Sequence, residues 1–465
     1  MKNRINEFIG LTVILLLFTA CNPFKPQIRQ SPAGELPETF SLYSKESDPL
    51  GRWWEEFHDS ELTGLIEEAL ADNLTLKEAW TRLNQARSLA VQVGAALYPD
   101  LTGTAGAFYD RRRSDTGSPK TESNDVYSLG LISSYELDLW GRIRSAREAA
   151  LLDVTAAREE VNTAAMTLTA EVARRWIFII SQQMQKRLLE HQLQVNRTYL
   201  ELIELRFRMS MVSALDVYQQ KQIIEDIKAE IPLVVAEEQV LRHELALLLG
   251  KPPQTQLKIG RVVMSEPTEI PATGLPADLL SSRPDLRRAG MRLKAAEWQV
   301  AAARANRLPA IRLTAGVQYG EGDMDVLFDN WILSLAGNLT APIFDGNRRA
   351  AEVDRREALV DENLFAYRQA VLTAIKEVDN ALVIESKQRE HIKGLEKVES
   401  AARKALEEAG VRYRNGLNDY LPVLTQLLAV QRLERDLIRQ RANLFNARIS
   451  LYRALGGTWT ESLTP

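Results

Sequence analysis

Cysteine and histidine are scarce in this chain of 465 residues. There is a single cysteine, Cys21, and there are four histidines at positions far apart in the sequence. One cysteine excludes an internal disulfide, and scattered histidines lack the spacing of a metal site. Neither a glycine-rich phosphate loop nor the nucleophile motif of a hydrolase is present. We therefore expect no enzymatic activity, no metal site and no cofactor.

An excess of positive charge is also missing. Lys and Arg number 58 and Asp and Glu number 62, which gives a formal net charge of −4 at pH 7. A nucleic-acid-binding protein would have a strongly basic face, so nucleic acid is not an expected partner. After residue 20 the sequence contains no apolar run of roughly 18 residues, so no transmembrane helix is expected.

The first residues have the pattern of a targeting segment. A positively charged start and the apolar residues 9–18 precede small residues and Cys21. We expect residues 1–20 to be a signal peptide and Cys21 to carry the diacylglycerol and N-acyl lipid of a bacterial lipoprotein, a firm membrane anchor. Asn22 rather than Asp follows, which in similar lipoproteins implies the outer membrane. The alternative is an ordinary signal peptide followed by an incidental cysteine.

The rest of the chain contains the same unit twice. Residues 83–109 match 293–319 at an offset of 210, and residues 206–250 match 412–456 at an offset of 206. A repeat this long exceeds a solenoid unit and indicates a duplicated domain half. The predicted segments are a lipidated tether (21–58), a first repeat (59–250, with a β-hairpin at 101–139 and a helical hairpin at 141–250), a linker (251–282), a second repeat (283–456, with a β-hairpin at 311–343 and a helical hairpin at 346–456) and a tail (457–465).

Each repeat predicts a β-hairpin with one apolar and one polar face. In the first, Leu129 and Leu131 alternate with Ser128 and Gly130. Strands of about ten residues with this alternation are typical of outer-membrane barrels, and hairpins on a soluble core are the alternative. Four strands cannot close a barrel, and an open edge is not tolerated in lipid. A dimer would supply eight strands and a trimer twelve, and the small polar residues favour the wider trimeric barrel.

The predicted helices are unusually long. Residues 141–207 and 348–413 contain no proline and have helical periodicity. Each helix would be ~100 Å long, so the two must be coiled-coil-like. A shorter helix is predicted over residues 60–98. The expected fold class is mainly α with a small β-barrel portion: a trimeric α-helical periplasmic barrel continuous with a 12-stranded outer-membrane β-barrel, with four strands per chain and an internal two-fold repeat.

Four motifs carry a resemblance to a known family. They are WWEEF at residues 53–57, SRPDL at 282–286, PAIRLT at 309–314 and RYRNG at 412–416. With them, the chain resembles the TolC-like outer-membrane efflux channels, in the lipoprotein branch that serves RND-type exporters. The resemblance implies a lipid-anchored homotrimer in the outer membrane that extends into the periplasm.

The same resemblance implies partners and a function. The trimer would dock on a periplasmic adaptor (membrane fusion) protein and an inner-membrane pump, and would be a passive duct for drugs or metal ions. A type I protein-secretion duct is the second possibility. A trimeric adhesin is disfavoured, because its strands would lie together at one end of the chain, whereas here they form two internal hairpins.

The resemblance places a gate at the turns between the long helices. Gate candidates are Leu421, Thr425, Asp216 and Tyr420, and adaptor-contact candidates are Ser210, Val212, Ser213, Arg412, Gly416 and Leu417. The chain departs from the family twice, because Ser210 replaces an expected glycine and Thr425 replaces an acidic residue. Asp216 could instead be a first-turn carboxylate favoured by the helix dipole, and Leu421 a coiled-coil core residue. Met209 and Met211 suit either a soft metal or simple packing.

Overall fold

The computed structural model describes residues 23–26, 33–42, 51–114, 120–260, 264, 270–271 and 273–464. The predicted signal peptide and the predicted lipidation site, Cys21, lie outside the described residues. Within these ranges, no helix combines the length and the apolar character needed to cross a membrane.

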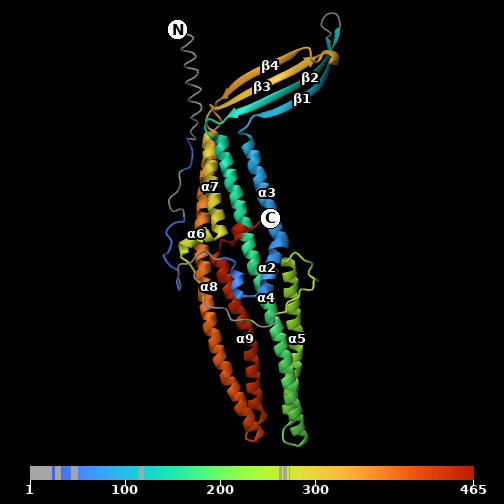
Figure 1. Ribbon diagram of the computed structural model, residues 1–465, viewed down its shortest axis with the longest axis vertical. Helices are drawn as coiled ribbons and strands as arrows, with labels where there is room; N and C mark the ends of the chain where they lie inside the picture. Colours follow the sequence, from blue (N-terminus) through green and yellow to red (C-terminus); the bar gives the residue numbers. More distant parts are fainter. Residues whose placement is uncertain are drawn as a thin grey trace. The chain divides into compact units, whose positions relative to one another are not determined.

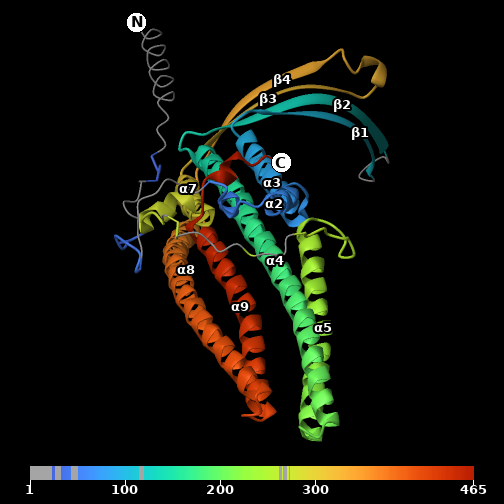
Figure 2. The same cartoon turned by 60° about the horizontal axis from the view of Figure 1, so that its bottom comes forward.

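Each half of the chain contains a β-hairpin followed by two long helices (Figures 1 and 2). The first half comprises η1 (Trp53–Phe57), α2 (Ser60–Asp72), α3 (Leu74–Ala95), β1 (Asp100–Ser114), β2 (Lys120–Leu137), α4 (Arg142–Arg208) and α5 (Ala214–Leu248). The second comprises η2 (Pro276–Asp278), α6 (Leu279–Ser282), α7 (Pro284–Ala305), β3 (Ala310–Glu321), η3 (Met324–Val326), β4 (Trp331–Thr340), α8 (Arg348–Arg414), α9 (Tyr420–Leu455) and η4 (Trp459–Ser462). Helices α4 and α8 have 67 residues each.

The chain forms two compact units that do not coincide with the two repeats. The first unit contains Arg82–Arg158 and Arg288–Arg368, and therefore all four strands. The second contains Glu35–Thr81, Glu159–Arg287 and Gln369–Pro465, and therefore both turns between the long helices. Each unit thus takes equivalent segments from both repeats.

The strands form one antiparallel sheet in the order β1-β2-β3-β4 (Figure 1). One row across the sheet runs Thr104, Gly130, Gln318 and Ile332. Because side chains alternate along a strand, this register puts all even-numbered residues on one face and all odd-numbered residues on the other. The odd face carries most of the leucines and aromatic residues, and Gly, Ser and Thr are the most frequent residues of the even face. Within the described residues, β1 and β4 are the two edges of the sheet.

The prediction of one continuous helix over residues 60–98 is wrong, because the helix breaks at Asn73. The backbone of Asn73 is extended, with a ψ of 125°. Its side-chain oxygen accepts a hydrogen bond from the Leu76 N–H at 2.9 Å, and its amide nitrogen donates to the Leu248 carbonyl at 2.9 Å. An Asn side chain can replace helical backbone bonds in this way, whereas apolar periodicity continues through the break.

The second repeat has the same break 210 residues later, at Arg283 between α6 and α7. The guanidinium donates to the Ala454 carbonyl at 3.0 Å and to Asp285 and Glu377 at 2.7 Å and 2.8 Å. Burial lowers the pKa of Arg283, but its carboxylate partners outweigh burial, so the pKa is raised. These bonds account for the SRPDL motif at residues 282–286 as a structural element.

Glycines end α5 and α9 beside these two breaks. Gly250 and Gly456 have φ values of 69° and 80°. A Cβ atom would lie 2.4 Å from the Asp72 carbonyl oxygen at Gly250 and 2.5 Å from the Ser282 carbonyl oxygen at Gly456. Both the backbone conformation and the close approach therefore require glycine.

The WWEEF motif forms the centre of an aromatic cluster. Trp53 stacks on Tyr452 with ring centroids 5.4 Å apart, and Trp54 meets Trp459 edge to face at 4.8 Å. Both Trp53 and Trp54 are buried. Such pairs add to the stabilisation from burial alone, so this motif joins η1 to the C-terminal part of the second unit.

Candidate functional sites: the helical turns and the strand-helix junction

The turns after α4 and α8 have the same backbone. The equivalent hydrogen bonds, each 2.9 Å long, join the Met211 N–H to the Arg206 carbonyl and the Leu417 N–H to the Arg412 carbonyl. Ser210 and Gly416 occupy the same left-handed conformation, with φ values of 60° and 74°. That conformation costs a residue with a Cβ atom roughly 1–2 kcal/mol. The serine at position 210 therefore adds strain to the turn without changing its path.

The helices that follow the turns begin differently. The hydroxyl of Ser213 accepts from the Asp216 N–H at 3.4 Å, and the Asp216 carboxylate accepts from the Ser213 N–H and hydroxyl at 2.9 Å and 2.8 Å. This is a capping box. In α9 the equivalent residues are Asp419, whose side chain makes no capping bond within the described residues, and Pro422. Asp216 is thus a capping residue, and whether it also belongs to a gate stays a prediction.

Equivalent arginines beside the two turns contact different groups. Arg206 donates to the Tyr413 carbonyl at 3.2 Å, and its guanidinium lies 4.4 Å from the centroid of the Tyr413 ring. Arg412 instead donates to Asn418 in its own turn at 3.2 Å. Burial raises the pKa of Tyr413, an effect that Arg206 opposes and Asp216 adds to. The first hairpin therefore supplies the side chain that joins the two turns.

A buried chain of polar groups also joins the two hairpins. The Tyr420 hydroxyl donates to Gln220 at 2.7 Å, and the Gln220 amide donates to the Asn196 side chain and carbonyl at 2.9 Å. The Asn196 amide donates to the Gln192 carbonyl at 2.7 Å, and Gln192 donates to the Gln431 carbonyl at 3.1 Å. All five residues are buried, so each bond replaces one that water would otherwise make. Burial raises the pKa of Tyr420, which keeps its phenol protonated.

The remaining predicted residues lie on the surface of the second unit. Leu417 and Leu421 are 67% and 58% exposed, and the hydroxyl of the exposed Thr425 donates to the Leu421 carbonyl at 2.9 Å. Val212 is half-buried, and Met209 and Met211 are exposed. Tyr420, by contrast, is only 1% exposed. In this structure it therefore packs between helices of its own chain, a placement that suits a residue holding the turns together.

Sequence reasoning missed Arg206, Tyr413 and the buried amides. Gln220 stands at a helical position between Val217 and Ile223, where the periodicity predicts an apolar side chain. A neutral polar residue at such a position needs a buried hydrogen-bond partner. The polar Gln220 in an apolar series is therefore the one sequence signal that indicates this network. The partners themselves come from another helix and could not be read from spacing.

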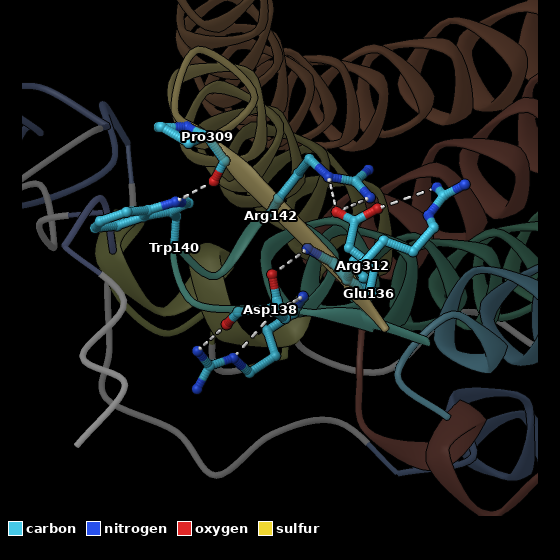
Figure 3. Close-up of polar contacts among 8 residues, drawn as sticks. Glu136, Asp138, Trp140, Arg142, Pro309 and Arg312 are labelled. Carbon is cyan, nitrogen blue, oxygen red and sulfur yellow. Dashed lines mark hydrogen bonds and ion pairs between the residues drawn. The ribbon is translucent and has the colours of Figure 1, made fainter. Parts of the chain in front are cut away.

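A second cluster of polar contacts lies where β2 leads into α4 (Figure 3). Arg142 donates twice to one oxygen of Glu136, at 2.7 Å and 3.1 Å, and Arg312 lies 3.6 Å from the other oxygen. The Trp140 indole N–H donates to the Pro309 carbonyl at 2.7 Å. These contacts tie β2, β3 and the start of α4 together. Among the described residues, no group of three His, Cys, Asp or Glu could hold a metal ion at either site.

Comparison with known proteins agrees with this architecture. Residues 65–251 and 275–457 match the family model of the outer membrane efflux protein. The chain belongs to this family. As an outer membrane efflux protein it is an outer-membrane channel component of an efflux system and not an enzyme. The family assignment confirms the predicted function class and the localisation in the outer membrane.

Relatives and solved structures of the family cover nearly the whole chain. The pyoverdine export outer membrane protein OpmQ of Pseudomonas aeruginosa is 32% identical over 421 residues, 89% of each chain. The toluene efflux pump outer membrane protein TtgF of Pseudomonas putida is 31% identical and covers 90% of this chain and 87% of its own. The solved outer-membrane channel OprN has a TM-score of 0.85 at 26% identity, covering 95% of this chain and 100% of its own. The mainly helical fold with a small four-stranded sheet is thereby confirmed.

Proposed function

We propose that three copies of this chain form one passive duct for small molecules across the outer membrane and into the periplasm. The observation that carries the proposal is the four-stranded sheet with one apolar face and two open edges. In lipid every backbone group must be paired, so β4 of one copy pairs with β1 of the next. Three copies give a closed barrel of 12 strands, and the even-numbered face lines its bore.

The sheet edges support this arrangement. All ten residues of β4 are exposed in the single chain, and Leu335 is 83% exposed. Ile343 and Phe344, just beyond β4, are 92% and 90% exposed. Large apolar side chains at such exposure are normally covered by lipid or by another protein surface. Lipid covers the odd-numbered face, and a second copy covers the strand edge.

A lipid on Cys21 and two protein partners complete the proposal. The chain is anchored in the outer membrane by the acylated Cys21, which stands among the residues that the structure does not describe. The turns after α4 and α8 bind a periplasmic adaptor protein, through which the duct works with an inner-membrane pump of the RND type. Exposed Leu417, Met209 and Met211 give these turns the apolar surface that such docking needs.

The proposed solutes are small molecules. Relatives of similar identity are named for pyoverdine export, toluene efflux and, in the CusC protein of Escherichia coli, cation efflux. All three names refer to small solutes and none to a secreted protein. This pattern favours efflux over protein secretion for this chain.

Photo-cross-linking in cells tests the proposal. A photoreactive residue at Leu417 or Ser213 is expected to capture a periplasmic adaptor, whereas the same residue at Leu233, which is 70% exposed in the middle of α5, is expected to capture none. The purified full-length protein is expected to have the mass of a trimer in detergent. Absence of capture at both turns, together with a monomeric mass, would contradict the proposal.

Single-channel recording tests the gate. We propose that Leu421 narrows the resting aperture and that Asp216 adds an acidic ring, so Leu421→Ser and Asp216→Ala raise the conductance of the resting trimer. Ser213→Ala is the control, because it removes the capping box and keeps the Asp216 carboxylate. If Ser213→Ala raises the conductance as much as Asp216→Ala, the capping role explains the effect. Unchanged conductance in Leu421→Ser removes Leu421 from the gate.

A further inference from the structure

Charged residues are confined to the two ends of the even-numbered face of the sheet. At the end joined to the helices this face carries Asp100, Glu136 and Arg312, and at the other end its charged residues include Asp110, Arg112 and Glu122. Between these ends, every described residue of this face is uncharged. A solute moving along the face therefore meets ionised groups at two levels, of which only the first adjoins the helices.

The geometry leaves Arg312 available to a solute. Glu136 and Arg312 are directly opposite each other in the register of β2 and β3. Glu136 is 18% exposed because Arg142 and Arg312 flank it (Figure 3), while the Arg312 side chain is 61% exposed. Arg312 and Glu136 form an ion pair, but the 3.6 Å between the guanidinium nitrogen and the carboxylate oxygen is too long for a hydrogen bond. Within the described part of the chain no hydrogen bond occupies the donors of this guanidinium, so oxygen atoms of a passing anion can accept from them.

A negative charge lies close to Arg312 on the same face. Asp100 is exposed at the start of β1, and one of its carboxylate oxygens accepts from the Ser134 N–H at 2.8 Å. Asp100 shares a row of the sheet with Ser134 and Thr314, and Arg312 lies two residues from Thr314, so Asp100 and Arg312 stand about 12 Å apart. The neighbouring pair of Asp138 and Arg144 is different, because Asp138 is 8% exposed and caps the start of α4. Among the strand residues of the even-numbered face at this level, the exposed charges are therefore one cation, Arg312, and one anion, Asp100.

We propose that Arg312 and Asp100 form a charged collar in the duct and contact ionised groups of the solutes that pass. The inference rests on the proposed function, in which the even-numbered face lines the bore. Glu136 and Arg142 are positioning residues, since Glu136 lies beside the Arg312 guanidinium and Arg142 holds the Glu136 carboxylate by two hydrogen bonds. In three copies the collar alternates positive and negative groups, so anionic and zwitterionic small molecules contact Arg312 and cationic groups contact Asp100.

Reactivity of introduced cysteines in the full-length trimer tests the collar. Thr314→Cys lies two residues from Arg312 and Thr102→Cys two residues from Asp100, each on the same face about 7 Å away. Each cysteine is labelled from outside the cell with a negatively or a positively charged thiosulfonate reagent at low salt, so a closed periplasmic end does not interfere. Protein without an added cysteine gives the labelling background.

The proposal expects shifts of opposite sign at the two positions. Arg312→Gln lowers the ratio of anionic to cationic labelling rates at Thr314→Cys by about fourfold, because a unit charge ~7 Å away in water changes each rate about twofold. Asp100→Asn raises the ratio at Thr102→Cys by a similar factor. Arg312→Lys keeps the parent ratio, since it keeps the charge. Arg304→Gln is the matched control, because Arg304 pairs with Glu357 on helices at 2.6 Å, and it leaves both ratios unchanged.

The outcomes separate this inference from the proposed function. Ratios that stay at parent values in both Arg312→Gln and Asp100→Asn overturn the collar. Cysteines at 314 and 102 that react with neither reagent in an assembled trimer show that this face is not a wet bore, which overturns the proposed function itself. A structural role of Arg312 alone would lower the thermal stability of the trimer and leave the labelling ratio of the assembled fraction unchanged, and this result also overturns the collar.

Discussion

The two repeats agree in their backbones and differ in their side-chain networks. Both break a helix at an equivalent position, Asn73 or Arg283, and both end a helix with a glycine against that break, Gly250 or Gly456. The breaks use different chemistry, an amide in one repeat and a guanidinium in the other, to reach the same carbonyl position. A duplicated backbone can therefore be maintained by different residues, provided that the same backbone groups are satisfied.

The turns show where this equivalence ends. Tyr420, at the start of α9, bonds to Gln220, whereas the equivalent residue of the first repeat is Ala214. Arg206 crosses to the second turn, whereas Arg412 stays within its own. The first helical hairpin thus supplies side chains that bond to the second turn, whereas the equivalent side chains of the second hairpin make no such bonds to the first turn among the described residues. The difference between the two turns therefore comes from their side chains and not from the path of the backbone.

The largest expected loss of stability follows from replacing Arg448 in α9, and the equivalent Arg242 in α5 is its control. Arg448 is 1% exposed and pairs with the fully buried Glu385 at 2.6 Å, while Arg242 is 18% exposed and pairs with Glu238 one turn away. Arg448→Met removes the main partner of a buried carboxylate and should cost about 3–4 kcal/mol. Arg242→Met should cost about 1 kcal/mol. Denaturant unfolding of the detergent-solubilised protein measures both changes in the free energy of unfolding. Equal losses in the two variants would show that the deeper burial of Arg448 does not make its ion pair more important than that of Arg242.

Alanine at the helix-ending glycines should have a similar effect in both repeats. Gly250→Ala and Gly456→Ala each combine an unfavourable φ with a Cβ clash against backbone, at about 2–4 kcal/mol. Gly416→Ala is the control, since among the described residues no atom beyond its chain neighbours lies within 4 Å of its Cβ position and only the φ penalty remains. The midpoint of thermal unfolding should fall least for Gly416→Ala. Equal decreases in the unfolding midpoint of all three variants would show that the Cβ clash does not contribute to the loss of stability.

Removing one hydroxyl tests the polar chain between the hairpins. Tyr420→Phe leaves the buried Gln220 oxygen without its donor, which should cost about 2 kcal/mol. Tyr218→Phe is the matched control, because Tyr218 is 70% exposed and lies two residues from Gln220. Hydrogen exchange of the amides around the second turn should speed up only in Tyr420→Phe. Unchanged exchange there would mean that the apolar contacts alone hold the turns together.

The smallest expected change in stability follows from exchanging the serine and the glycine at the two turns. Ser210→Gly should stabilise the protein by about 1 kcal/mol, and Gly416→Ser should destabilise it by the same amount, because only glycine adopts a positive φ freely. The double swap should leave the stability near that of the parent. A loss of stability in Ser210→Gly would indicate that the serine hydroxyl makes a contact that offsets the strain.

Much of the fold could be predicted from periodicity and repeat matching, but the sites could be predicted only in part. The strands and long helices follow from spacing, because the apolar residues recur with a period of 2 or 3.6. The break at Asn73 was missed, since one capping residue does not alter that period. At the turns, the position of Asp216 in the first turn of its helix indicates a capping role, whereas nothing in the residue spacing predicts the burial of Tyr420 against Gln220. Contacts between segments 200 residues apart leave no local signal.

The sequence by itself determined the duplication, the alternating faces of the sheet, the uninterrupted long helices and the family, because each depends on residue order within one segment. Only the tertiary structure decided which side chains meet across segments. It brought Arg142 and Arg312 to Glu136 from separate elements and left the guanidinium of Arg312 exposed. It also placed Tyr420 on Gln220. Which side chains contact each other depends on their distance in space. The number of residues between two positions in the sequence specifies that distance only when both lie in the same helix or strand.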